Sequence, residues 1–115
     1  MSFWRRLFGG AREAPSPQRL DYFNEALALE RQGDLDAALT SYRLALRDDP
    51  RNVKALQNMA IVCRKQARPE EALRYYRQAL AIDPDLPGAH YGVAFLLRHR
   101  GERSRAAEHL RAFLA

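Results

Sequence analysis

The repeating pattern is clearest in RQGDLDAALTSYRLALRDDPRN (residues 31–52), which aligns without gaps with KQARPEEALRYYRQALAIDPDL (residues 65–86). A third stretch, HRGERSRAAEHLRAFLA (residues 99–115), continues the alignment at the same offset of 34 residues. Small residues match small ones, large match large, and proline matches proline. The matching columns are Gly33, Ala67 and Gly101; Ala38, Ala72 and Ala106; Tyr42, Tyr76 and Leu110; Ala45, Ala79 and Phe113; and Pro50 and Pro84. A constant spacing of this kind predicts an internal repeat.

Each repeat unit is expected to contain two helices. In the second unit, Asn52 is a suitable N-cap for a helix over residues 53–66, and Pro69 suits the first turn of the next helix. Asp83-Pro84 should end that helix, because proline lacks an amide hydrogen and disfavours helical geometry at the residue before it. The apolar residues follow helical spacing. They are Leu56, Met59, Ala60 and Cys63 in the first helix, and Ala72, Tyr76, Ala79 and Leu80 in the second.

These residues resemble the tetratricopeptide repeat, in the period of 34 residues, the small residue in the turn, the Ala/Tyr/Ala columns and the final Asp-Pro. The resemblance covers residues 19–115 and implies an all-α, right-handed superhelix of three helix-turn-helix units, at 19–52, 53–86 and 87–115. Tyr22, Leu56 and His90 stand in the column where the family often has tryptophan. We expect His90 to weaken the packing at the start of the third unit.

The resemblance further implies that the first helix of each unit lines a concave groove. Its expected lining is Phe23, Asn24, Leu27 and Arg31; Gln57, Asn58, Ile61, Arg64 and Lys65; and Tyr91, Phe95, Arg98 and His99. Aromatic and aliphatic side chains, amides and positive charge together favour a protein partner, a peptide or helix with apolar anchors and some acidic residues. Leu27, Ile61 and Phe95 could instead pack between helices, so Phe23 and Tyr91 are the preferred contact residues.

Some family members grip a chaperone's C-terminal carboxylate with lysine, asparagine and arginine side chains. The matching positions here hold Phe23, Leu27, Asn58, Gly88 and Gly92. Only Asn58 agrees with that set, so the positive clamp is missing. The sequence predicts that this chain does not bind such a carboxylate tail.

The N-terminal arm, residues 1–10, contains FWRRLFGG (residues 3–10). On a helix its apolar side chains would share an arc of about 140°, with the two arginines on the other side. These residues are Phe3, Trp4, Leu7 and Phe8, with Arg5 and Arg6. The order resembles the membrane-targeting segment of the bacterial Min-system cell-division ATPase, and residues 11–18 are expected to form a proline-containing linker. We expect a short amphipathic helix that binds a membrane or a membrane protein weakly and reversibly.

Two other interpretations of the arm stay open. It could pack on the repeats, in the same copy or in another, and cover the apolar residues of the last helix. Those residues are Leu110, Phe113 and Leu114. It could also be a disordered leader.

Composition limits the class of protein. The chain has 115 residues, of which 47% are hydrophobic and 29% charged, which suits one small globular domain. It lacks a run of the roughly 18 to 20 apolar residues that would span a bilayer, and the arm is a poor secretory signal. A single cysteine, Cys63, agrees with a reducing compartment. The expected location is therefore the cytoplasm, with peripheral contact at the inner face of a membrane.

The sequence disfavours nucleic-acid binding and catalysis. A net charge of +5 is spread over 19 basic and 14 acidic residues, without a basic stripe. His90, His99 and His109 lack the helical spacing that brings two ligands to one metal, and we expect no metal and no cofactor. Cys63 is expected to be an inert core residue. We expect a non-catalytic adaptor, with a structural homo-oligomerisation module capped by the arm as the alternative.

Overall fold

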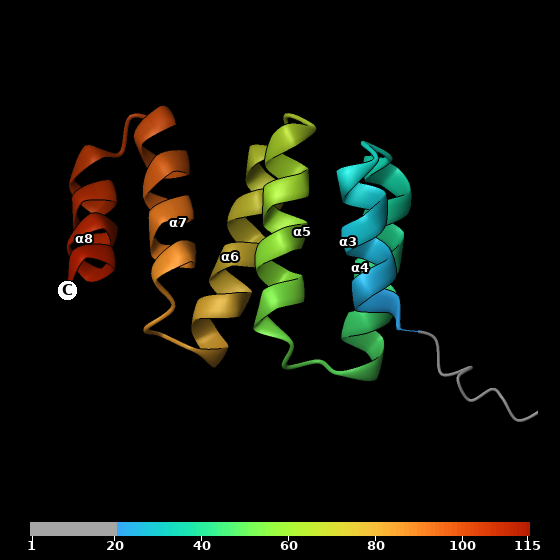
Figure 1. Ribbon diagram of the computed structural model, residues 1–115. Helices are drawn as coiled ribbons and strands as arrows, with labels where there is room; N and C mark the ends of the chain where they lie inside the picture. Colours follow the sequence, from blue (N-terminus) through green and yellow to red (C-terminus); the bar gives the residue numbers. More distant parts are fainter. Residues whose placement is uncertain (1–20) are drawn as a thin grey trace, which may run out of the picture.

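The computed structural model describes residues 21–115, and this part of the chain is helical, without a strand. Within residues 21–115, six helices follow one another as antiparallel pairs, stacked side by side into an elongated array (Figure 1). Their bounds are α3 (Tyr22–Arg31), α4 (Leu35–Asp48), α5 (Val53–Lys65), α6 (Pro69–Ile82), α7 (Pro87–His99) and α8 (Arg103–Leu114). In Figure 1, α3 and α5 lie in front of α4 and α6, so the view faces the first helices of these pairs. The all-α repeat architecture expected from the sequence is confirmed. The arm and linker expected over residues 1–18 lie outside the described residues.

Local signals set the helix ends. The Asn52 carboxamide oxygen accepts the Ala55 amide at 3.0 Å, as expected for the N-cap of α5. Pro69 occupies the first turn of α6, and that helix ends immediately before Asp83-Pro84. Where the sequence suggested an end at residue 66, α5 ends at Lys65, with Gln66 as its C-cap. The two helices of the second pair are therefore delimited by local caps and prolines.

The turns inside the three pairs share one backbone conformation. Gly33 and Gly101 have φ of 84° and 85°, and Ala67, in the same column, has φ of 59°. Glycine adopts this left-handed conformation without steric cost, whereas alanine carries a Cβ that strains it. The small-residue column of the sequence thus marks the place where each chain reversal needs a positive φ.

The core runs through the array from α3 to α8, and its small members let the helices approach one another. Ala26, Ala60 and Ala94 are almost fully buried at the same position of α3, α5 and α7. Among the largest fully buried side chains are Tyr42 and Met59. Neighbouring pairs therefore share one continuous core, as stacked repeats require.

Candidate functional site

Two tyrosines of the repeat place their hydroxyl groups against the helix that begins their own pair. The Tyr42 hydroxyl donates to Glu30 Oε1 at 2.6 Å, and the Tyr76 hydroxyl accepts from Arg64 Nη1 at 3.5 Å. Both contacts join positions 12 residues apart, and each partner occupies the same column of the repeat. This repeat position therefore holds an acidic residue, Glu30, in the first pair and a basic residue, Arg64, in the second.

Burial raises the pKa of both tyrosines. For Tyr42, the Glu30 carboxylate raises the pKa further, because it favours the protonated hydroxyl. For Tyr76, burial raises the pKa, while the Arg64 guanidinium opposes this effect by favouring the phenolate. Both hydroxyls therefore stay protonated at neutral pH and act as fixed hydrogen-bonding groups.

A first hollow opens between α3 and α5. It is lined by Leu27, Glu30, Arg31, Asn58 and Lys65. Lys65 Nζ lies 3.2 Å from Glu30 Oε2, so this lysine is paired with the acid that also accepts from Tyr42. The positive charge expected from Lys65 is therefore paired with an acid of the neighbouring helix pair.

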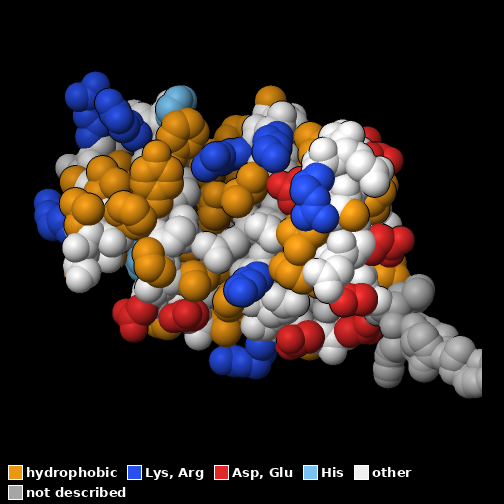
Figure 2. Space-filling view, viewed as in Figure 1, with side chains coloured by type: hydrophobic (Ala, Val, Ile, Leu, Met, Phe, Trp, Pro, Cys, Tyr) orange, Lys and Arg blue, Asp and Glu red, His pale blue; other side chains and the backbone are white. Residues whose placement is uncertain are grey.

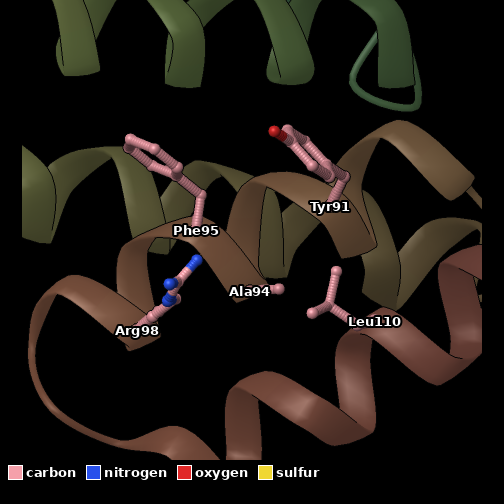
Figure 3. Close-up of a pocket in the computed structure, with 5 residues that line it drawn as sticks. All are labelled: Tyr91, Ala94, Phe95, Arg98 and Leu110. Carbon is pink, nitrogen blue, oxygen red and sulfur yellow. The ribbon is translucent and has the colours of Figure 1, made fainter.

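A second hollow lies at the other end of the array, between α7 and α8 (Figure 3). It is lined by Tyr91, Ala94, Phe95, Arg98 and Leu110. Tyr91 and Phe95 project from the same side of α7, and Leu110 of α8 faces them across Ala94. The exposed fractions of Tyr91 and Phe95 are 49% and 40%, which is high for aromatic side chains.

The aromatic side chains of α7 also connect the second hollow with its neighbours. The Arg64 guanidinium lies over the Phe95 ring, 4.9 Å from its centroid, within the range of a cation–π contact. His99 also packs on Phe95, with ring centroids 4.3 Å apart, and Tyr91 packs on Phe113 of α8, with ring centroids 5.4 Å apart. The exposed aromatics are thus held in place by α5, α7 and α8.

The remaining expected groove residues divide into packing and capping roles. Phe23, Leu27 and Ile61 are partly buried against the core. This burial favours packing between helices, rather than partner contact, for Leu27 and Ile61. It also makes Phe23 a weaker candidate for partner contact than the exposed Tyr91. The Asn24 amide is occupied by Asp21, with Nδ2 donating to Oδ2 at 2.6 Å. Gln57 is half-buried beside Gly88.

The structure also brings together two histidines that the sequence argument kept apart. His90 Nδ1 and His109 Nδ1 lie 2.9 Å apart, and His90 Nε2 lies 2.6 Å from the Pro84 carbonyl oxygen. We expected His90 to weaken the packing of the third unit. Instead, its ring contacts both the loop that follows α6, at Pro84, and His109 of α8. Helical spacing was the wrong test, since the two rings come from different helices. Within residues 21–115, no three His, Cys, Asp or Glu side chains gather as a metal would require.

Local sequence patterns do not mark Glu30 or Leu110 as residues of the site. Glu30 pairs with a lysine 35 residues away, and such contacts between helices leave no mark in local spacing. Leu110 was read only as an exposed apolar residue, although its column holds tyrosine in the other two units. That substitution was the available signal for the second hollow.

Apolar and charged side chains are distributed unequally over the front face (Figure 2). Apolar side chains gather over α7 and α8, and acidic side chains lie mainly over the opposite end and along one edge.

Cys63 is fully buried, as expected, and burial raises the pKa of its thiol. None of the helices in the described part has the length and apolarity needed to cross a bilayer.

Comparisons with known proteins agree with this architecture. Two tetratricopeptide repeat models match residues 23–87 and 64–115, and no curated protein matches the sequence significantly. Two crystal structures of MamA superpose with TM-scores of 0.78 and 0.75, both at 17% identity and over 81% of this chain. This chain spans 54% and 51% of those MamA chains, about half their length.

A third similar structure is the second TPR of Spaghetti (RPAP3) bound to the HSP90 peptide SRMEEVD. It superposes with a TM-score of 0.77 at 19% identity, over 81% of this chain and 86% of its own. At these identities the structural likeness shows the fold. Because one family model alone matches residues 23–87, more than half of the sequence, the chain belongs to the tetratricopeptide repeat family.

Proposed function

We propose that this protein is a non-catalytic adaptor that binds a peptide or helix of a protein partner across the surface of α3, α5 and α7. The observation that carries the proposal is the pair of exposed aromatics, Tyr91 and Phe95, held in fixed positions on α7. Preorganised aromatic side chains on a surface are the usual anchors of protein recognition, because little further ordering is needed when a partner arrives. The peptide bound to the Spaghetti TPR supports the same use of the fold.

Charge narrows the kind of partner. Arg64 and Arg98 border the exposed aromatics, whereas Lys65 is already paired with Glu30. A partner segment with apolar anchors next to acidic residues would match this end of the surface. The positions that would clamp a C-terminal carboxylate hold Phe23, Leu27, Gly88 and Gly92 beside Asn58, so we do not propose the peptide class bound by the Spaghetti TPR.

The test compares affinity capture by the full-length wild type with capture by two single variants. Tyr91→Ala should lose specific partners, while Leu114→Ala, which truncates a side chain that is 77% exposed at the end of α8, should retain them. Thermal melting of each variant checks that the fold is intact. Equal capture by both variants and the wild type would refute the proposed surface.

The alternative function is structural homo-oligomerisation through the end face of α8. Its support is the exposure of Leu110, Phe113 and Leu114, at 37%, 38% and 77%. Sedimentation velocity over a range of concentrations tests it. A stable homo-oligomer that Phe113→Ser disperses, with no other partner captured, would favour this alternative over the adaptor.

The arm, residues 1–10, is proposed to add a weak membrane or partner contact. The support is its composition, with Phe3, Trp4, Leu7 and Phe8 interrupted by Arg5 and Arg6. Co-sedimentation with anionic vesicles, for the full chain and for a chain lacking residues 1–10, tests it. Equal sedimentation of the two proteins would rule out a membrane role of the arm and leave packing on the repeats or a disordered leader. Membrane contact of this kind would place a cytoplasmic protein at the inner face of the membrane.

A further inference from the structure

The second hollow results from a missing tyrosine. In the second unit, the Tyr76 ring lies against Gly92 of the next pair, and its hydroxyl reaches Arg64 on its own pair. The equivalent positions in the third unit are Leu110 and Arg98. Leucine has neither the ring nor the hydroxyl, so the space beneath Arg98 is left open between α7 and α8.

The environment of that space retains the chemistry that suits a tyrosine-sized group. Its walls are the apolar surfaces of Tyr91, Ala94, Phe95 and Leu110, and Arg98 stands at its edge. Within residues 21–115, Arg98 forms no ion pair, whereas Lys65 and Arg100 do. A cation beside an apolar hollow is complementary to a ring or branched aliphatic group that carries, or adjoins, a negative charge.

We propose that this hollow is the anchor site for one bulky apolar side chain of the partner, with an adjacent carboxylate paired to Arg98. The inference rests on the proposed adaptor function and deepens it, because it names the position that fixes the register of the bound segment. A side chain supplied by the partner would occupy the volume that Tyr76 fills inside the second unit. Its carboxylate would contact Arg98 where the Tyr76 hydroxyl contacts Arg64.

The experiment uses 3-phenylpropionate, which joins a phenyl ring to a carboxylate, as the probe. Titration of the isotopically labelled full chain, followed by two-dimensional NMR, should shift the amide signals around Arg98 and Leu110. Saturation should occur at millimolar concentrations, since so small a ligand makes few contacts in an open hollow and still pays the entropic cost of binding. The neutral analogue 3-phenylpropionamide should bind at least several-fold more weakly.

Leu110→Tyr is the matched variant, because it restores the residue found in the other two units. It should fold at least as stably as the wild type and bind 3-phenylpropionate at least tenfold more weakly. Arg98→Met should bind the acid and the amide equally. Absence of saturable shifts, shifts located away from α7 and α8, or unchanged binding by Leu110→Tyr would overturn the proposal.

The two proposals fail separately. If Tyr91→Ala loses captured partners while Leu110→Tyr retains them all, the anchor site is wrong and the adaptor function stands. If the probe binds as described but no variant changes capture, the hollow is a real site and the adaptor function is wrong. Self-association that Leu110→Tyr abolishes would identify a second copy as the occupant and would also overturn the proposed partner chemistry.

Discussion

The ring of Tyr76 lies directly on the backbone of α7 at Gly92, so closely that no side chain fits between them. Replacing Gly92 with alanine would place a Cβ inside the van der Waals radius of the ring carbons. Because Tyr76 is itself buried, it has little room to withdraw. We expect Gly92→Ala to lower the free energy of unfolding by about 1–3 kcal/mol, the usual cost of overpacking.

The control for this change is Gly88→Ala on the same helix. A Cβ at Gly88 would meet only the amide end of the Gln57 side chain, at 2.7 Å, and that end can rotate away. The midpoint of urea unfolding should therefore stay nearly constant for Gly88→Ala and fall for Gly92→Ala. Equal midpoints would show that the third pair does not pack on Tyr76 as described.

Ala67 offers a stabilising substitution. It holds a φ of 59° in the column where Gly33 and Gly101 occur. Ala67→Gly should relieve the strain of the left-handed conformation, which costs roughly 1–2 kcal/mol for a residue with a Cβ. Part of this gain in stability is offset, because glycine increases the conformational entropy of the unfolded chain. We expect a rise in Tm of a few degrees by calorimetry. The reverse change, Gly33→Ala, should lower Tm, because alanine would be strained at the positive φ of this position. A Cβ at Gly33 would meet no other atom, so the loss would report the backbone strain alone.

The histidine pair predicts a loss of stability in acid. Burial lowers the pKa of His109, and the nearby His90, Arg105 and Arg77 lower it further against the opposing Glu108. The unfolded state therefore binds a proton more readily than the folded state, so stability falls as pH drops through the unfolded pKa of about 6.5. Thermal melts between pH 8 and 5 should show a steeper decline for the wild type than for His109→Gln. Parallel declines would mean that the pair contributes nothing to this dependence.

Cys63 should react slowly with thiol reagents. Its side chain is fully buried, and burial raises the pKa of the thiol, with Glu71 adding to the effect, so the reactive thiolate is scarce at neutral pH. Labelling by a maleimide should proceed only as the native fold opens, and it should accelerate in denaturant in step with unfolding. Rapid stoichiometric labelling of the native protein would contradict this burial.

The sequence was sufficient to predict the helix pairs. Caps, prolines and small turn residues affect only the backbone within a few residues of their own position. The roles of Asn52, Pro69 and Gly33 could therefore be predicted from the neighbouring sequence alone. Periodicity then placed Tyr76 and Cys63 in the core, where both are buried. None of these inferences needed to know how one pair sits on the next.

The candidate site was less predictable because its chemistry arises between helices. Lys65 was expected to offer positive charge to a partner, but it pairs with Glu30, 35 positions away in the sequence. His90 and His109 meet only because α7 and α8 lie antiparallel. Pairings of this kind depend on rotamers and helix packing, which a count along one helix does not contain.

The hydrogen bonds of Tyr42 and Tyr76 have a consequence for how this surface can change. A hydroxyl group donates to the Glu30 carboxylate in one pair and accepts from the Arg64 guanidinium in the next, with the same ring position supporting both. An acid and a base are thus interchangeable at this point without a change in the scaffold beneath. Reversal of charge at residue 30 or 64 is therefore a route by which the molecule could acquire new binding preferences while its architecture stays the same.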